Sequence, residues 1–138
     1  MEKLLKEHNL KITNTRLIIL EELCKLNKSI TAEELSKIVN KIKKTNLSTI
    51  YRNLKVLTEK NLVVKVAELN SETYFQLNTD KHIHHLICVN CKEILPLDTC
   101  PLHELENLLK TETGYEIISH SLEFRGLCPN CKEKTHLK

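Results

Sequence analysis

Four cysteines in two C-x-x-C pairs are the residues of this chain whose type and spacing most clearly suggest a chemical role. Cys88 and Cys91 form the first pair, and Cys128 and Cys131 form the second. Four thiolates are the usual ligand shell of a structural zinc ion. The stretch between the pairs is longer than in a usual zinc ribbon, so it must contain folded structure. We therefore predict one structural Zn²⁺ bound by these four residues.

Histidines near the first pair form a second candidate metal site. His82 and His84 lie two residues apart on a predicted strand and share one face, whereas His85 projects from the opposite face. His103 falls in the first turn of a later predicted helix, and His120 falls on a predicted last strand. If the two strands pair, His82, His84, His103 and His120 meet. Four imidazoles suit zinc, iron, nickel or copper. The alternative is that they are ordinary surface histidines.

Charge is unevenly distributed along the 138 residues. Residues 1–78 contain 14 Lys or Arg against 9 Asp or Glu, whereas residues 79–138 contain 7 against 9. This asymmetry predicts two domains, 1–78 and 79–138, the first of which faces a polyanion. A lysine excess of this size also fits an ordinary solvated surface.

Hydropathy indicates a cytoplasmic protein. No apolar run approaches the length of a membrane span, and the N-terminus has no signal-peptide pattern, so we expect no membrane partner. Disulfides are rare in that compartment, which favours metal or redox chemistry for the C-x-x-C pairs. The sequence shows no catalytic triad, P-loop or paired carboxylates. We therefore expect no enzyme and no small organic substrate.

The first half predicts helices followed by a hairpin. Helices are expected over 2–9, after Thr13 or Thr15, after a capping box at 31–34, and over 48–60. Strands are expected over 62–66 and 74–77. This order of elements predicts a winged helix-turn-helix. Cys24, on the second helix, is predicted to be a small buried side chain.

The helix over 48–60 has a polar face beside its apolar stripe. Thr49, Tyr51, Arg52 and Lys55 lie on that face, and such side chains are suited to base edges and phosphates. A polar outer face is also common on any amphipathic helix.

The second half predicts a small α/β unit. Strands are expected over 82–89, 93–97 and 115–124. A helix beginning at Pro101 is expected to bury Leu102, Leu105, Leu108 and Leu109. Cys100 lies near the start of this helix, where it is either a thiol of lowered pKa or a buried structural residue.

The chain resembles the ferric uptake regulator (Fur) family of bacterial metal-responsive or peroxide-responsive repressors. The resemblance covers essentially the whole chain, and it rests on five motifs: Lys11–Arg16, Thr31–Leu35, Ser48–Leu54, His84–Cys91, and His120-Ser-Leu122 followed by Gly126-x-Cys128. It implies an α+β protein, in which a winged helix-turn-helix precedes a small α/β dimerisation domain. It also implies a homodimer that binds double-stranded operator DNA in a metal-dependent way.

Site residues follow from the resemblance position by position. Cys88, Cys91, Cys128 and Cys131 match the structural zinc ligands, and His82, His84, His103 and His120 match a regulatory metal site. Two of the latter four are carboxylates in many members, so an all-histidine set is a departure. Tyr51 and Arg52 match the recognition-helix contacts, and Lys11, in the same motif as Arg16, matches a minor-groove lysine.

A second metal site of the family bridges the two domains, and this sequence lacks most of its ligands. The matching positions hold Ser29, Gln76, Ile83, His85 and Pro96. Peroxide sensing in the family depends on iron at that site. We therefore predict a repressor controlling metal homeostasis genes, with zinc as the first choice of sensed ion, followed by Fe²⁺ or Ni²⁺.

Three alternatives remain open at this point. A peroxide-responsive regulator of the same family and a zinc-stapled protein-interaction module each fit part of the pattern. A C-x-x-C redox enzyme would leave the second cysteine pair without a role.

Overall fold

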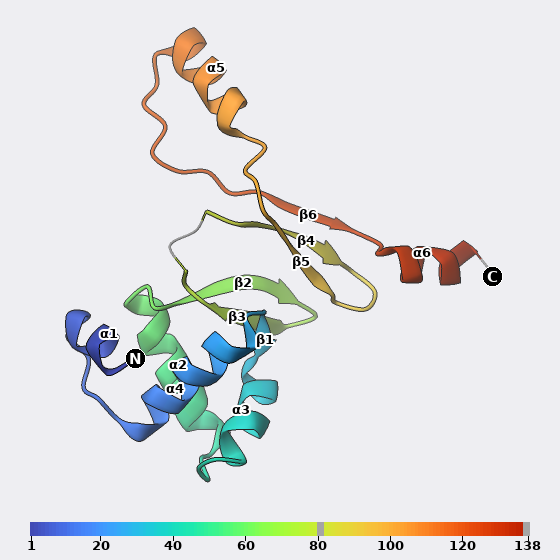
Figure 1. The fold of residues 1–138 in the computed structure, drawn as a ribbon. Helices are drawn as coiled ribbons and strands as arrows, with labels where there is room; N and C mark the ends of the chain where they lie inside the picture. The colour runs from blue at the N-terminus through green and yellow to red at the C-terminus, as the bar shows by residue number, and fades with distance from the viewer. Residues whose placement is uncertain (80–81, 137–138) are drawn as a thin grey trace. The chain divides into compact units, whose positions relative to one another are not determined.

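The computed structural model describes residues 1–79 and 82–136 (Figure 1). The chain divides into two compact units, Met1–Thr79 and Asp80–Lys138. Each unit combines helices with a three-stranded sheet, so the predicted α+β class is confirmed. Among the described residues, no helix is long and apolar enough to cross a membrane.

The first unit is a winged helix-turn-helix, as predicted. Its helices are α1 (Glu2–Glu7), α2 (Asn14–Leu26), α3 (Ala32–Asn40) and α4 (Leu47–Glu59). Its strands are β1 (Ile30–Thr31), β2 (Val63–Leu69) and β3 (Glu72–Leu77), which form an antiparallel sheet in the order β1-β3-β2.

Side-chain caps fix where the helices of this unit begin. The Thr13 hydroxyl accepts a hydrogen bond from the backbone N–H three residues later and starts α2, whereas Thr15 is buried. Thr31 and Glu34 form the predicted capping box of α3. Asn46 caps α4 through its side-chain oxygen. These caps satisfy backbone donors that the first turn of a helix leaves free.

The wing and the core complete this unit. Asn70 and Ser71 both have positive φ, 50° and 66°, as the two central residues of a type I′ hairpin turn require. The prediction that Cys24 is buried was wrong, because its side chain lies on the exposed side of α2. The core is almost entirely aliphatic and is formed mainly by Ile19, Leu20, Leu23, Leu35, Ile50, Leu54, Leu57, Val63 and Phe75.

The second unit is built on a mixed sheet. Its strands are β4 (His84–Cys88), β5 (Ile94–Leu97) and β6 (Glu123–Gly126), in the order β5-β4-β6. β4 is antiparallel to β5 and parallel to β6. Helix α5 (His103–Thr113) lies between β5 and β6 in the chain, and α6 (Pro129–His136) follows β6.

Two predictions for the second unit were wrong. The last strand begins at Glu123 rather than Tyr115, because residues 114–122 form no regular secondary structure. No residue of α5 is buried, and Leu105, Leu108 and Leu109 are 48%, 51% and 39% exposed. The apolar stripe of α5 is present, but α5 stands away from the sheet of its own unit (Figure 1). We call residues 98–122, which leave and rejoin the sheet and include α5, the α5 arm.

Candidate metal centres and nucleic-acid interface

The sulfur atoms of Cys88, Cys91, Cys128 and Cys131 converge on one point, and we call them the four-cysteine group. All four lie within 4.8 Å of one another, and the Sγ atoms of Cys91 and Cys128 are 3.7 Å apart. A disulfide would need about 2.05 Å. Zn–S bonds of about 2.3 Å place two sulfurs of a tetrahedral shell roughly 3.8 Å apart. The donor set and its spacing therefore fit zinc.

Backbone geometry prepares the four-cysteine group for negative charge. The Cys128 N–H donates to Cys88 Sγ at 3.3 Å, and Asn90 Nδ2 donates to Cys131 Sγ at 3.2 Å. Hydrogen bonds from the backbone of Cys128 and then of Cys91 lower the pKa of Cys88 to about 6. At Cys128 the backbone of Cys131 lowers the pKa, but the Cys131 side chain and burial outweigh it and raise the pKa to about 12. One thiolate forms readily and another is opposed by its neighbours, so a divalent cation is needed to hold four.

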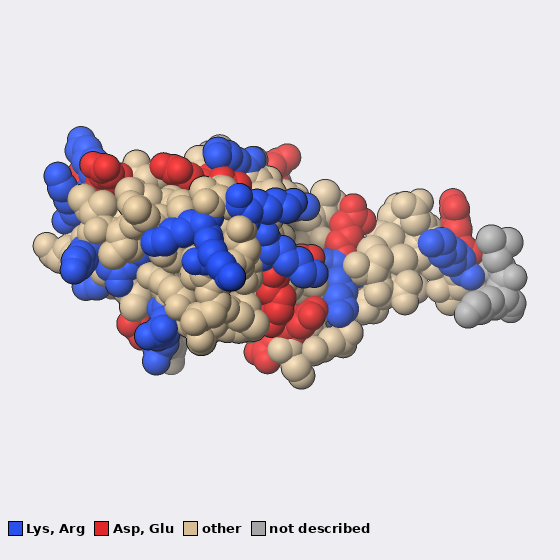
Figure 2. Space-filling model, turned by 90° about the horizontal axis from the view of Figure 1, so that it is seen from below, with Lys and Arg blue, Asp and Glu red and all other residues tan. Residues whose placement is uncertain are grey.

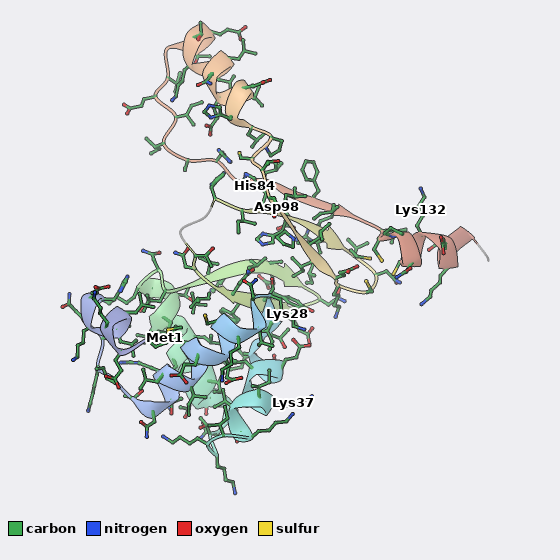
Figure 3. All side chains as sticks on the ribbon, viewed as in Figure 1. Met1, Lys28, Lys37, His84, Asp98 and Lys132 are labelled. Carbon is green, nitrogen blue, oxygen red and sulfur yellow. The ribbon has the colours of Figure 1, made fainter. Side chains whose placement is uncertain are left out.

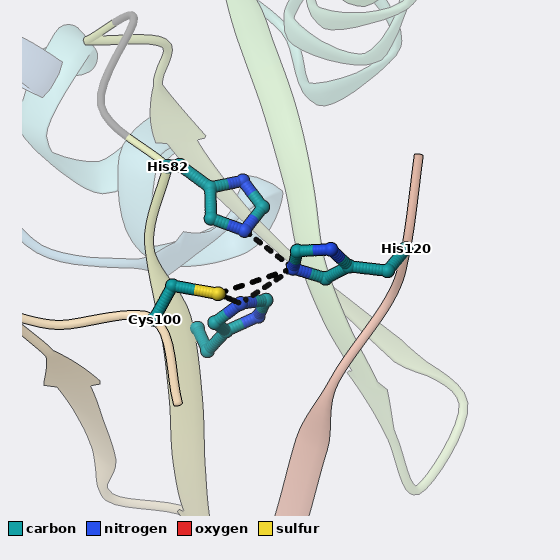
Figure 4. A group of neighbouring side chains, drawn as sticks. His82, Cys100 and His120 are labelled. Atoms are coloured by element: carbon teal, nitrogen blue, oxygen red, sulfur yellow. Dashed lines mark hydrogen bonds between the residues drawn. The ribbon is translucent and has the colours of Figure 1, made fainter. Parts of the chain in front are cut away.

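A second convergence joins His82, His84, Cys100 and His120, and we call it the histidine–cysteine group. The Nε2 atom of His120 lies 2.5 Å from Nε2 of His82, 3.0 Å from Nε2 of His84 and 3.4 Å from Sγ of Cys100 (Figure 4). The Cys100 Sγ is 3.3 Å from His84 Nε2. All four donor atoms lie within 4.8 Å of one another, so small shifts separate them from a shell of zinc ligands.

Strand register explains why these side chains meet. His84 pairs with Leu97 in the antiparallel ladder, so the chain just beyond β5 lies beside the chain just before β4. Figure 3 shows His84 and Asp98 together at this end of the sheet. His85 pairs with Glu123 in the parallel ladder, which brings the residues just before β6 to the same end. Cys100 and His120 arrive from these two neighbouring segments.

Outer hydrogen bonds set which ring nitrogens face the centre. His120 Nδ1 donates to the Glu106 carboxylate, and the His84 ring hydrogen-bonds the backbone at Leu122. The Nε2 atom of His120 therefore presents a lone pair, as metal-ligating histidines usually do when a carboxylate binds the other nitrogen. The same bond lowers the pKa of Glu106.

His84 is the buried member of the group, with 4% of its surface exposed. Burial, followed by the nearby rings of His82 and His120, lowers its pKa, although the Leu122 hydrogen bond opposes the shift. The ring is therefore neutral at pH 7 and able to donate its Nε2 lone pair.

The structure brings together three of the four predicted histidines and adds a cysteine. His103 is the first residue of α5 and lines a cavity of about 440 Å³ together with His82, Cys100 and Glu106, but it is outside the histidine–cysteine group. The sequence pattern left the role of Cys100 open and did not indicate Glu106. The two strands predicted over 82–89 and 93–97 could have indicated Cys100. When they pair as a hairpin, the residues just after β5 lie beside the residues just before β4.

The positions that match the family's second metal site mostly lack metal-binding side chains. In the first unit, Ser29 Oγ donates to Gln76 Oε1 at 3.4 Å. In the second, Pro96 pairs with His85 across the β4–β5 ladder. His85 is half-buried, and burial, followed by the nearby His84 ring, lowers its pKa.

The predicted nucleic-acid contacts lie on or near α4. Tyr51, Arg52 and Lys55 are exposed, and Thr49 is half-buried and accepts a 3.3 Å hydrogen bond from Arg52. Figure 2 shows many Lys and Arg side chains, with Asp and Glu side chains among them. A helix face with these side chains can reach bases and phosphates in a major groove.

Arg16 connects this helix to the segment before α2. Its Nε donates to Asn53 Oδ1 at 3.2 Å, and its Nη1 donates to the Lys11 carbonyl at 2.9 Å. Arg16 therefore holds Lys11 at a fixed place relative to α4.

Tyr51 is held by a carboxylate from α3. Its hydroxyl donates to Glu33 Oε1 at 2.5 Å, which raises the pKa of Tyr51 and lowers that of Glu33. This bond fixes the direction of an aromatic side chain that is 43% exposed.

Comparisons with known proteins confirm the resemblance to one protein family. A family model described as the ferric uptake regulator family matches residues 7–125. The peroxide operon regulator of Bacillus subtilis (strain 168) is 34% identical over 131 residues, covering 94% of this chain and 90% of its own.

Two solved structures show the same fold. The ferric uptake regulator of Vibrio cholerae superposes with a TM-score of 0.79 at 29% identity, covering 91% of this chain and 98% of its own. The Campylobacter jejuni peroxide stress regulator superposes with a TM-score of 0.71 at 28% identity, covering 95% of this chain and 98% of its own.

We expect Cys91→Ser to lose the zinc of the four-cysteine group. Zinc binding is coupled to folding in such sites and contributes roughly 10–16 kcal/mol of apparent free energy in small zinc domains. The second unit should therefore unfold at lower denaturant concentration. Elemental analysis and urea unfolding measure both effects. Cys24→Ser, an exposed cysteine in the other unit, is the control. A Cys91→Ser protein that keeps its stability without zinc would refute the assignment.

His84→Ala and His85→Ala should separate the two faces of β4. Loss of the His84 ring removes a ligand from the histidine–cysteine group, whereas loss of the His85 ring does not. A Zn²⁺ titration monitored by calorimetry should show that binding at the histidine–cysteine group is lost only in His84→Ala. Protons compete with Zn²⁺ for the histidine nitrogens. The affinity of the histidine–cysteine group for Zn²⁺ should therefore fall as pH drops below about 6.5, the ordinary pKa of histidine. The opposite pattern between the two variants would place the site on the other face.

Proposed function

Because the chain belongs to the ferric uptake regulator family, and is thus a transcriptional regulator rather than an enzyme, we propose that it is a zinc-responsive repressor of metal homeostasis genes. In this proposal it acts in the cytoplasm as a homodimer on double-stranded operator DNA. The observation that carries the proposal is the pair of ligand groups at opposite ends of β4. The four-cysteine group is at the Cys88 end, and the histidine–cysteine group is at the His84 end.

The two groups are suited to different tasks. Two of the four cysteines are buried and the group offers a closed tetrathiolate shell, which suits a permanent structural zinc. The histidine–cysteine group supplies three imidazoles and one thiolate, a set that suits borderline ions and disfavours magnesium, calcium and manganese. Four ligands leave no open position, which favours zinc, with Fe²⁺ and Ni²⁺ next.

Ion binding at the second group would attach the α5 arm to the sheet. Cys100 and His120 lie near the two ends of the arm, and His84 lies on β4. No residue of α5 is buried, so contacts within its own unit hold this helix only weakly. A bound ion would therefore fix the arm, and this is the conformational step through which the ion controls DNA binding.

The α5 arm also supports the proposed homodimer. Leu105, Leu108 and Leu109 form an exposed apolar stripe on α5, and Tyr115 and Ile118 beyond it are 75% and 91% exposed. Exposed apolar side chains gathered on one face of a helix often mark a protein–protein interface. A second copy of the chain, bringing the same stripe, would cover it by a two-fold contact.

DNA recognition is assigned to the first unit. We place α4 in the major groove, with Tyr51 near base edges and Arg52 and Lys55 at phosphates. Lys11, positioned by Arg16, would reach the adjacent backbone or minor groove. The Vibrio cholerae regulator described above, at 29% identity, has DNA-binding domains, which supports DNA as the partner of this chain.

Arg52→Ala should weaken binding to every DNA sequence. Each lost phosphate contact should reduce the slope of log affinity against log salt by about 0.9, and a dimer loses one contact in each protomer. Tyr51→Ala should instead relax sequence preference, by about 1–3 kcal/mol at the base it contacts. Fluorescence anisotropy against operator and scrambled DNA, with zinc and with chelator, measures both. Lys25→Ala, whose charge is already paired with Glu22, is the control. Equal affinity in all four proteins would exclude this docking, and equal affinity with and without zinc would exclude metal control.

Leu108→Glu should shift the protein from dimer to monomer, since it places a charge within the proposed apolar interface. Asn107→Glu adds the same charge on the other side of α5 and should leave the dimer intact. Sedimentation velocity of both variants at matched concentration and zinc content gives the result. A Leu108→Glu dimer as stable as the unsubstituted protein would assign the interface elsewhere.

A further inference from the structure

We propose that Cys100 makes the histidine–cysteine group a peroxide-sensitive metal site, from which oxidation of this one thiolate releases the ion. The inference rests on the metal-responsive function proposed above and adds a second input to it. The relative from Bacillus subtilis is named a peroxide operon regulator. In this chain, however, four of the five ligand positions of the second family site hold Ser29, Gln76, Ile83 and Pro96, and only His85 could bind a metal. A peroxide response here needs a different reactive group.

Cys100 is the sole sulfur donor of the histidine–cysteine group, and it is in ligand position. Its Sγ lies 3.3 Å from His84 Nε2 and 3.4 Å from His120 Nε2. A thiolate is both the form of cysteine that binds an ion and the form that attacks a peroxide. The state of Cys100 that completes the site is therefore also its reactive state.

A small oxidant can reach this sulfur. Cys100 is partly exposed and lines the cavity of about 440 Å³ described above. Part of the cavity wall is Ile117 and Ile118, which come from a segment without regular secondary structure. In the four-cysteine group, Cys88 and Cys131 are each only 4% exposed, whereas Cys128 is as partly exposed as Cys100 and Cys91 is more exposed, so exposure alone does not set Cys100 apart.

The chemical step balances with hydrogen peroxide as the oxidant. Cys100 Sγ attacks one peroxide oxygen, an S–O bond forms and the O–O bond breaks. Sulfur loses two electrons, and the departing hydroxide takes a proton to become water. The sulfenic acid that results has lost the charge of the thiolate, so three neutral imidazoles remain to face a doubly charged ion.

The structural consequence is release of the α5 arm. Cys100 ties the entry of the arm to β4, while His120 ties its return. Once Cys100 no longer binds, the ion is held by fewer ligands and the arm is attached at one side only. No second thiol belongs to the group, and the four-cysteine group lies at the other end of β4. Reversal therefore needs an external thiol, which forms a mixed disulfide with loss of water and is displaced by a second thiol.

Zinc-loaded protein gives the sharpest test, because zinc has no redox chemistry of its own. The full chain, carrying zinc in both groups, is treated with hydrogen peroxide. Released zinc is followed with a chromophoric chelator, and the oxidised residue is identified by peptide mass spectrometry. Operator binding is measured before treatment, after treatment and after addition of a thiol reductant. We expect release of the zinc of one group, one added oxygen on Cys100, and loss of DNA binding that the reductant restores.

Two matched variants distinguish oxidation of Cys100 from other causes of zinc release. Cys100→His replaces the thiolate by a fourth imidazole, and its zinc release should be about tenfold slower or more, since no reactive sulfur remains in the group. His103→Ala removes a side chain from the same cavity, keeps Cys100, and should stay sensitive.

Oxidation found first at Cys91 or Cys128, or equal zinc release from Cys100→His and the unsubstituted protein, would overturn the proposal. If Cys100→His fails to fold, the residue that peptide mass spectrometry finds oxidised in the unsubstituted protein is sufficient to support or overturn the proposal. Failure of zinc-loaded protein to bind DNA before any peroxide is added would count against the proposed function, whereas zinc release and oxygen addition would still decide this inference.

Discussion

The pairing register of β4 with its two neighbours is the constraint on which both ligand groups depend. His84 opposite Leu97 and His85 opposite Glu123 bring three segments to one end of the sheet, and Cys88 opposite Gly126 brings the two cysteine pairs together at the other. Side chains alternate along a strand, so a slip of one residue would turn His84 away and present His85 instead. The same ladder hydrogen bonds thus determine the ligands of both proposed ions.

The α5 arm shows how little of the second unit is held by ordinary packing. Its helix has no buried residue, and the stretch from 114 to 122 has no ladder bonds of its own. The first unit is different, since its helices share a continuous aliphatic core with the wing. Local stability follows buried apolar contacts, so the arm is the part of the chain where one ion, or one oxidised sulfur, can change a conformational equilibrium most.

Much of the fold could be predicted because its signals are local. The capping box of Thr31 and Glu34 marks the start of α3, and the apolar spacing of Ile50, Leu54 and Leu57 marks the inner face of α4. The paired C-x-x-C motifs predicted which cysteines would meet, since two short knuckles restrict the choice of partners. Elements with weak local signals were missed: β1 and α6 were not predicted, and the last strand is confined to Glu123–Gly126.

By itself the sequence determined the winged helix, the four-cysteine group, and the shared face of His82 and His84. These follow from helical and strand periodicity or from neighbouring positions in the chain. Tertiary structure alone decided that Cys100, rather than His103, joins them, and that Leu105, Leu108 and Leu109 lie exposed. The physical reason is that an apolar stripe does not specify what will cover it, and that a ligand set depends on which distant segments a strand register places side by side.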